Sequence, residues 1–196
     1  MKPSVQNGPP HVILGGGIGS GKSLVAELLD AAGAAVISGD GVGHGVLEPG
    51  GPAFTKVTAR WPSVVVEGRI DRSRLAGIVF RNPPELAELE ALTHPAIVET
   101  ILDRVTEIDQ PVIVEVPVIL DLGHGWRRVF VDADEKVRIE RAVARGADEA
   151  DVRRRAAAQA DREVWLLWAD DVIVNEGTKE ELAAQVRALW DRLVGE

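Results

Sequence analysis

The sequence contains no cysteine, and several classes of protein are excluded by that absence alone. Disulfide frameworks, thiolate zinc sites and cysteine nucleophiles all require a residue that this chain lacks. The absence fits the reducing cytoplasm, where we expect the protein to be located. Long apolar runs are lacking as well, and none approaches the roughly 18 residues that a membrane-spanning helix needs.

Positive charge is also scarce. The chain has 22 lysines and arginines against 31 aspartates and glutamates, which gives a formal net charge of -9 at pH 7. Such a balance argues against a surface that wraps nucleic acid or adheres to an anionic membrane. We therefore expect no nucleic acid and no membrane as partner. A local basic pocket for phosphates is compatible with this charge, because the net value averages over the whole surface.

Short apolar runs alternate with amphipathic stretches along the chain. This alternation predicts an α/β fold in which helices flank a five-stranded parallel sheet. The expected strands are 11–16, 34–40, 111–119, 128–134 and 171–177, and the expected helices are 22–33, 136–145, 148–168 and 178–194.

The 196 residues are most simply one domain, 11–196, after a polar and proline-rich segment, 1–10, that we expect to be a disordered tail. The segment from about 41 to 108 departs from the alternation, because it has helical periodicity and only one short strand run, at 63–68. It is too long for a plain crossover between strands. We therefore expect a helical region inserted into a core formed by 11–40 and 109–196.

The stretch "GGGIGSGKS" (15–23) matches G-x-x-x-x-G-K-[ST] from Gly16 to Ser23, directly after a predicted strand and before a predicted helix. In such a loop the backbone N–H groups point at phosphate oxygens, and the helix amino terminus adds positive charge. Lys22 is expected to reach the β- and γ-phosphates, and the Ser23 hydroxyl to ligate Mg²⁺. The motif and both its flanks favour a nucleoside triphosphate site over a glycine-rich turn that binds nothing.

The remaining motifs narrow the class of protein. We find no N-K-x-D base reader of the kind that GTPases use, and "VIVE" (112–115) is only a weak Walker B run. In its place the segment 138–162 is rich in arginine, as in the mobile lid that closes over the triphosphate in small-molecule kinases. The alternative is a solvated helix whose arginines are paired in salt bridges.

At this point the chain resembles a known family. The segments "GGIGSGKS", "GRIDRSRLAGIVF", "LEALTHPAI", "RAAAQADRE" and "ADDVIVNEG" have the order and spacing seen in dephospho-coenzyme A kinases, and the resemblance spans about 11–194. It implies a P-loop kinase fold with a helical acceptor-binding region after the second strand and a lid after the fourth. It also implies that ATP, with Mg²⁺, phosphorylates the ribose 3′-hydroxyl of dephospho-coenzyme A, the last step of coenzyme A synthesis. We expect a monomer or a weak homo-oligomer.

The resemblance assigns roles to individual residues. Lys22, Asp40 and Arg141 are implied to be catalytic. Arg155 and Gln159 would lie on the returning helix of the lid, and Arg72 and His94 would shape the acceptor region, although His94 is open to a structural role as a helix cap or a bridge between loops. The residues implied to bind ATP are Gly17, Gly19, Ser20, Gly21, Lys22, Ser23, Leu24, Arg145 and Asn175, the last bordering the adenine.

The chain also departs from the family pattern. Ser38-Gly39-Asp40 stands where the family has Asp-Ala-Asp, whose first aspartate is the proposed general base. We expect Asp40, or a water that it holds, to take the proton; the alternative is that Asp40 only caps the following helix. His44 replaces an arginine, Asp121 replaces a glutamate, and Leu24 replaces a threonine that contacts phosphate through its backbone. Ser38, Asp40, His44 and Asp121 complete the expected substrate-binding set.

Two other functions are compatible with these departures. One is a related small-molecule kinase whose altered "SGDGVGH" segment reshapes the pocket for a different acceptor. The other is a nucleotide or coenzyme A sensor with impaired phosphotransfer. Lys22, Ser23 and the lid arginines count against the sensor, because a protein that only binds has less need of groups that stabilise the transition state.

Overall fold

The computed structural model describes residues 9–195, so most of the tail expected over 1–10 lies outside the described residues. The chain forms two compact units. One, here called the core unit, comprises 9–38 and 107–195. The other, the insertion unit, comprises 39–106. None of the described helices is long and apolar enough to cross a membrane.

A five-stranded parallel sheet forms the centre of the core unit, as predicted, with the strand order β2-β5-β1-β6-β7. The central strand β1 is buried on both faces, with Val12, Ile13 and Leu14 almost inaccessible to solvent, which explains its uninterrupted apolar sequence. The strands are β1 (His11–Gly15), β2 (Ala35–Ser38), β5 (Val112–Glu115), β6 (Trp126–Asp132) and β7 (Asp171–Val174).

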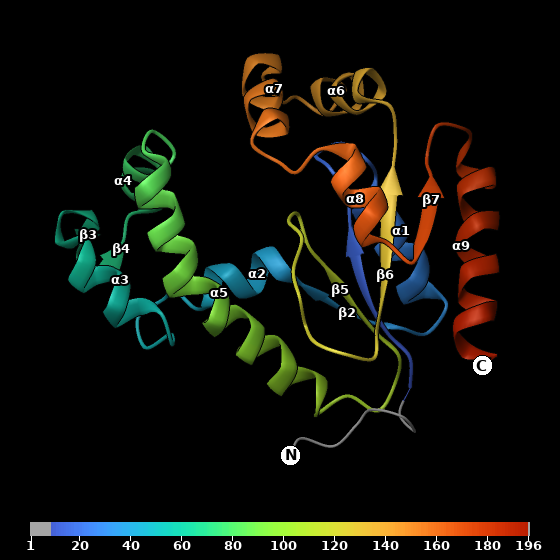
Figure 1. The fold of residues 1–196 in the computed structure, drawn as a ribbon, viewed down its shortest axis with the longest axis horizontal. Helices are drawn as coiled ribbons and strands as arrows, with labels where there is room; N and C mark the ends of the chain where they lie inside the picture. Colours follow the sequence, from blue (N-terminus) through green and yellow to red (C-terminus); the bar gives the residue numbers. More distant parts are fainter. Residues whose placement is uncertain (1–8, 196) are drawn as a thin grey trace. The chain divides into compact units, whose positions relative to one another are not determined.

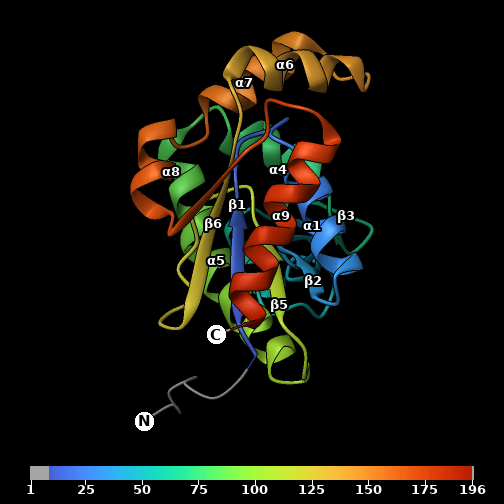
Figure 2. The same ribbon diagram turned by 90° about the vertical axis from the view of Figure 1, so that its right-hand side faces the viewer.

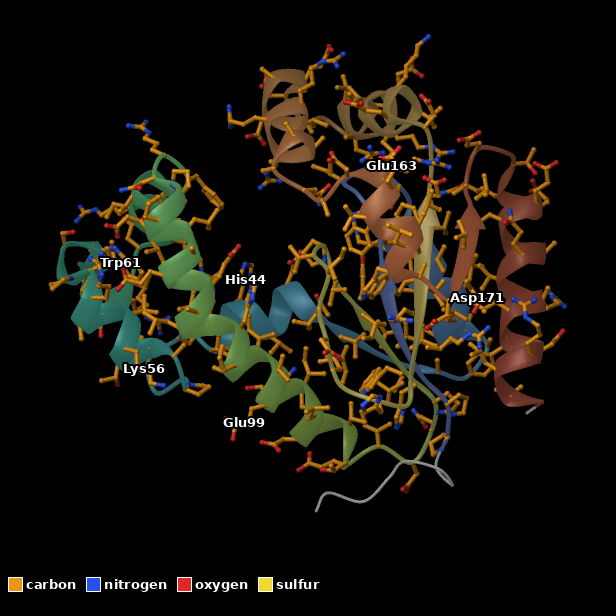
Figure 3. The ribbon with its side chains drawn as sticks, in the orientation of Figure 1. His44, Lys56, Trp61, Glu99, Glu163 and Asp171 are labelled. Carbon is orange, nitrogen blue, oxygen red and sulfur yellow. The ribbon has the colours of Figure 1, made fainter. Side chains whose placement is uncertain are left out.

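Helices cover both faces of this sheet (Figures 1 and 2). On one face, α1 (Lys22–Ala31) and α9 (Lys179–Val194) pack their apolar sides against β1 and its neighbours in one buried cluster. On the other face, α8 (Arg162–Trp168) places Trp165 in a stack over Phe130 of β6, with 5.5 Å between the ring centroids. Figure 3 shows Glu163 at the start of α8 and Asp171 at the start of β7.

Two expected elements differ in the structure. The helix predicted over 148–168 is two helices, α7 (Glu149–Ala157) and α8, because Gln159 lies in the connection and its side chain binds backbone groups elsewhere. The strand predicted over 34–40 ends at Ser38, and α2 (Gly39–Gly45) begins at the next residue. Asp40 is therefore helical, and the four glycines of α2 do not prevent a helix.

The insertion unit is mainly helical. The long helix α5 (Pro83–Val105) is contacted by α2, by α3 (Phe54–Arg60) and by α4 (Arg72–Val79) (Figure 1). A short 3₁₀ turn, Pro62–Val64, leads into an antiparallel pair, β3 (Val65–Val66) and β4 (Arg69–Ile70), so the expected run at 63–68 contributes one very short strand.

A polar cluster ties α3 to α5 within this unit. The Nε1–H of Trp61, labelled in Figure 3, donates to Oε2 of Glu85 at 2.6 Å, and Arg60 binds both Glu85 and Glu88. The hydrogen bond from Trp61, helped by Arg60, lowers the pKa of the Glu85 carboxyl. The cluster therefore keeps Glu85 ionised and fixes the start of α5 to the end of α3.

We expect Gly15→Ala to destabilise the core unit. A Cβ atom at residue 15 would lie 2.3 Å from Cζ3 of the buried Trp165 ring, which cannot move away from its stack, and such overpacking costs about 1–3 kcal/mol. The matched control is Gly77→Ala in α4, where an added Cβ atom would have no other atom within 4 Å. Alanine there should raise the free energy of unfolding by about 0.5–1 kcal/mol. Urea unfolding followed by circular dichroism measures both; equal midpoints for the two variants would contradict this packing.

Candidate active site

The loop between β1 and α1 has the backbone conformation that the glycine-rich motif predicts. Gly19 and Gly21 have φ values of 78° and 95°, in the left-handed region that other residues avoid. A Cβ at residue 19 would also lie 2.1 Å from the backbone oxygen of Arg138. Gly21 directly precedes α1, so the loop delivers its backbone N–H groups at the helix amino terminus, where an anion is stabilised.

This loop forms one wall of a cavity of about 220 Å³. Four cationic side chains line the cavity, Lys22, Arg141, Arg145 and Lys179, and no carboxylate does. The composition suits a polyanion such as a triphosphate. From the expected set the cavity brings together Gly17, Gly19, Gly21, Lys22, Ser23, Leu24, Arg141, Arg145 and Asn175. Lys179 was missed by the sequence analysis, although its position at the start of the last helix, directly after the Asn175 segment, was visible.

Asn175 connects three parts of this cavity. Its side-chain Nδ2 donates to the carbonyl oxygen of Ser20 at 2.7 Å, in a buried bond between residues 155 positions apart. Its own carbonyl oxygen accepts a hydrogen bond from Nη1 of Arg141 at 2.8 Å. The segment around Asn175 was expected to border the adenine, and the side-chain amide itself is bound to the loop. Ser20 is buried behind the loop and does not line the cavity.

The Ser23 hydroxyl donates a hydrogen bond to Oε1 of Glu115 at 2.9 Å. Because its proton points at Glu115, the lone pairs of the Ser23 oxygen remain available to a hard cation. Glu115 ends β5, and in the sheet it lies beside Ser38 of β2. The described residues contain no group of three or more acidic, histidine or cysteine side chains that would hold a metal by itself. Glu115 was not among the expected site residues, and the weak "VIVE" run was its only signal.

Five of the seven arginines of 138–162 fall into two groups. On α7, Arg153, Arg154 and Arg155 all pair with carboxylates of the same helix, at Glu149 and Asp151, as the alternative of a solvated helix describes. On α6 (Glu135–Ala144) and at its carboxyl cap, Arg141 and Arg145 line the cavity and pair with no carboxylate of the described part of the chain. Of the arginines in this segment, the two that line the cavity are thus without a carboxylate partner among the described residues.

The expected acceptor residues lie elsewhere. In the core unit, Ser38 is exposed at the end of β2, and Asp121 is exposed after β5, where its Oδ1 accepts the N–H of Gly123. In the insertion unit, Asp40 and His44 occupy the first and last turns of α2.

Arg72 begins α4 and pairs with Glu48 at 3.1 Å. His94 lies well inside α5, so it neither caps a helix nor bridges loops, and that alternative was wrong. His44, labelled in Figure 3, belongs to the same unit, in which α2 and α4 both contact α5.

A parallel sheet with a glycine-rich loop at the carboxyl end of β1 and a cationic cavity around it defines a nucleotide-binding P-loop kinase. Solved structures agree. TT1252 from Thermus thermophilus superposes with a TM-score of 0.81 at 30% identity, covering 95% of this chain and 99% of that one. Dephospho-CoA kinase from Campylobacter jejuni, at 22% identity, shares the fold with a TM-score of 0.69, covering 94% and 97%.

The sequence comparisons name the family. The model of the dephospho-CoA kinase family matches residues 11–181. The dephospho-CoA kinase of Thermobifida fusca is 42% identical over 188 residues, 92% of this chain and 94% of that protein. The enzyme of the same name from Corynebacterium efficiens is 38% identical and covers 93% and 94%. The chain belongs to the dephospho-CoA kinase family.

We expect Asn175→Asp to weaken ADP binding at least tenfold. The aspartate loses the N–H that holds the Ser20 carbonyl and adds a negative charge beside the phosphate cavity. Isothermal titration calorimetry measures the affinity. Asn82→Asp is the matched control, because Asn82 is exposed at the start of α5, makes no capping hydrogen bond and changes the net charge equally. Equal affinities for the two variants would show that Asn175 does not organise the loop.

Proposed function

We propose that the protein transfers the γ-phosphate of ATP to the ribose 3′-hydroxyl of dephospho-coenzyme A, with Mg²⁺ as the metal ion. The observation that carries the proposal is the cationic cavity around the phosphate loop, which four cations and no carboxylate line, in a chain of the dephospho-CoA kinase family. Phosphoryl transfer leaves little covalent work to the protein, so positioning and charge stabilisation account for most of the catalysis.

Lys22 and Arg141 are proposed to be catalytic, Lys22 at the β- and γ-phosphates and Arg141 at the charge that develops during transfer. Arg145 and Lys179 would bind the nucleotide in the same cavity. The hydrogen bond from Arg141 to Asn175 supports its role, because it fixes the guanidinium beside the loop before ATP arrives.

Ser23 is the proposed protein ligand of the metal ion, and Glu115 orients it. A magnesium ion bound with ATP keeps several waters and needs only one or two protein oxygens, which the Ser23–Glu115 pair supplies. The ion would neutralise phosphate charge during transfer. The direction of the hydrogen bond supports the assignment, since the Ser23 oxygen turns its lone pairs away from Glu115.

The acceptor is proposed to bind through Ser38, Asp40, His44, Arg72, His94 and Asp121, with the insertion unit as the acceptor-binding region and 138–162 as the lid. Asp40 is the proposed group that takes the proton of the 3′-hydroxyl, directly or through water. A serine hydroxyl at position 38 stays protonated near pH 7 and is a poor base. The cytoplasmic location, the oligomeric state and the absence of a nucleic-acid partner stay predictions from the sequence.

We expect coupled ADP release with dephospho-coenzyme A and little or none with adenosine, a nucleoside monophosphate or pantetheine. Lys22→Ala should abolish turnover and leave the circular dichroism spectrum unchanged, because Lys22 lines the cavity and is not part of the buried apolar core. Equal rates with several of these acceptors would refute the assigned acceptor. Turnover by Lys22→Ala within tenfold of the parent would show that the loop does not handle the γ-phosphate.

We expect Asp40→Asn to lower kcat at least a hundredfold, because it removes the carboxylate that takes the acceptor proton. Ser38→Ala should cost less than tenfold, and Ser38→Asp, which restores the residue implied by the family, should match the parent or exceed it. Steady-state kinetics at saturating ATP measure all three. If Ser38→Ala lowered kcat at least a hundredfold and Asp40→Asn less than tenfold, the Ser38 hydroxyl rather than the Asp40 carboxylate would be the group that binds the acceptor hydroxyl.

A further inference from the structure

Arg138 lies in the first turns of α6, three residues before Arg141 and seven before Arg145. This spacing places the three arginines on the same side of the helix axis. The Nε of Arg138 donates to the carbonyl oxygen of Ala133 at 3.1 Å, so the side chain folds back over the start of α6 toward the end of β6. Figure 1 shows α6 following directly from β6. The guanidinium is therefore held in one place without any ligand.

The guanidinium of Arg138 is in contact with the phosphate loop. A Cβ atom at Gly17 would lie 2.1 Å from Nη1 of Arg138 and 3.1 Å from its Cζ. A Cβ atom essentially never comes within 3.0 Å of a non-bonded atom elsewhere in a protein. The guanidinium of Arg138 occupies the space that a side chain at residue 17 would fill. A Cβ atom at Gly19 would likewise clash with the backbone oxygen of Arg138, so the first part of α6 lies against the loop at two glycines.

No carboxylate of the described chain forms an ion pair with Arg138. The buried Asp132, at the end of β6, is bound through both oxygens by Arg162 and raises the pKa of that arginine through this hydrogen bond. Asp134 is engaged as the cap of α6. An arginine has five N–H donors, and Nε is the donor of Arg138 for which the structure provides an acceptor. Its terminal nitrogens thus offer charge and hydrogen bonds to an anion at the loop.

The place of that anion follows from two neighbouring cavities. A cavity of about 630 Å³ over the end of β6 shares Gly17 with the cavity around the phosphate loop. Arg138 and Arg162 line the larger cavity together with five carboxylates, whereas Arg141 and Arg145 line the smaller one, which no carboxylate lines. The smaller cavity is therefore the place that suits an anion. Gln159 also lines the larger cavity beside Gly17, but it already binds the Ile18 N–H and the Pro117 carbonyl. Arg138 is therefore a cation that contacts Gly17 from the larger cavity, next to the cation-lined cavity in which the phosphates are proposed to bind.

We propose that Arg138 is a further catalytic residue, which donates hydrogen bonds from its terminal nitrogens to the transferring phosphoryl group. In the step that it assists, the bond from the γ-phosphorus to the bridging oxygen of ADP breaks and a bond to the acceptor oxygen forms. The acceptor proton leaves to Asp40 or water, and Arg138 keeps its own protons. The inference rests on the proposed kinase function and extends it. An arginine supplied in this way is worth about 10³–10⁵ in kcat in other phosphoryl-transfer enzymes.

The first test separates catalysis from nucleotide binding. Arg138→Met should lower kcat at least a hundredfold while the affinity for ADP, measured by calorimetry, stays within threefold of the parent, because the charge is needed in the transition state. The kcat of Arg138→Lys should lie between those of the parent and of Arg138→Met, since lysine keeps the charge and loses the planar guanidinium. The matched control is Arg192→Met near the end of α9, whose arginine is paired with Asp171 and lies outside the proposed site and lid, and it should leave kcat unchanged.

A second variant, Gly17→Ala, displaces the Arg138 side chain while residue 138 itself stays arginine. Gly17 does not have a left-handed φ, so alanine suits its backbone, and the new Cβ would push aside the flexible end of Arg138. Gly17→Ala should therefore lower kcat as Arg138→Met does, and the double variant should be no slower than Arg138→Met alone.

A further readout is the complex of the enzyme with ADP, aluminium fluoride and dephospho-coenzyme A, which mimics transfer. Its slow dissociation should be lost in Arg138→Met and kept in Arg192→Met. Three results would overturn the inference: kcat of Arg138→Met within tenfold of the parent, ADP affinity that falls as far as kcat/KM, or independent effects of Gly17→Ala and Arg138→Met. A parent protein that does not phosphorylate dephospho-coenzyme A would instead refute the proposed function. Hydrolysis of ATP by the parent and by Arg138→Met would then test the arginine, because transfer of the phosphoryl group to water develops the same charge, and equal hydrolysis rates would overturn the inference.

Discussion

The buried hydrogen bond from Asn175 to the carbonyl of Ser20 is the interaction on which the candidate site depends most. It joins the end of β7 to the loop after β1, so it can form only when strands far apart in sequence are already in register. The same residue accepts from Arg141 and thereby couples α6 to the loop. A buried amide of this kind is stabilising only when it is fully paired, since an unpaired donor would carry its full desolvation cost. Loop, strand and arginine are therefore fixed together.

The parallel topology explains why the other functional groups collect beside this bond. Parallel strands bring their carboxyl ends to one edge of the sheet, and the edge receives Glu115 from β5, Asp132 from β6 and Asn175 from β7. Each of these polar groups has a partner: Ser23, Arg162 and Ser20, respectively. The acidic groups are held by their partners, and the charged side chains that line the cavity around the loop are all cations.

The sequence was sufficient for the sheet and the phosphate loop, because both depend on local patterns: buried apolar runs, and glycines between a strand and a helix. It was insufficient for Glu115 and Arg138, because their roles depend on which residues the fold brings beside them. The side chain of Glu115 matters through its bond to Ser23, and Arg138 through the space that Gly17 leaves. Asp40 was placed in a strand for a related reason, since nothing local showed that the chain turns into α2 directly after Ser38.

The division of the arginines follows from the cost of holding charge without a partner. An exposed pair such as Arg153 with Glu149 gains little, because water and salt screen it, and it places no demand on a ligand. A half-buried guanidinium with no carboxylate, as at Arg138 or Arg141, loses part of its hydration and recovers it only when an anion binds. The overall charge of -9 sharpens the contrast, because most cations elsewhere on the chain can find an acidic neighbour. Leaving Arg138, Arg141 and Arg145 without such neighbours reserves their positive charge for phosphate.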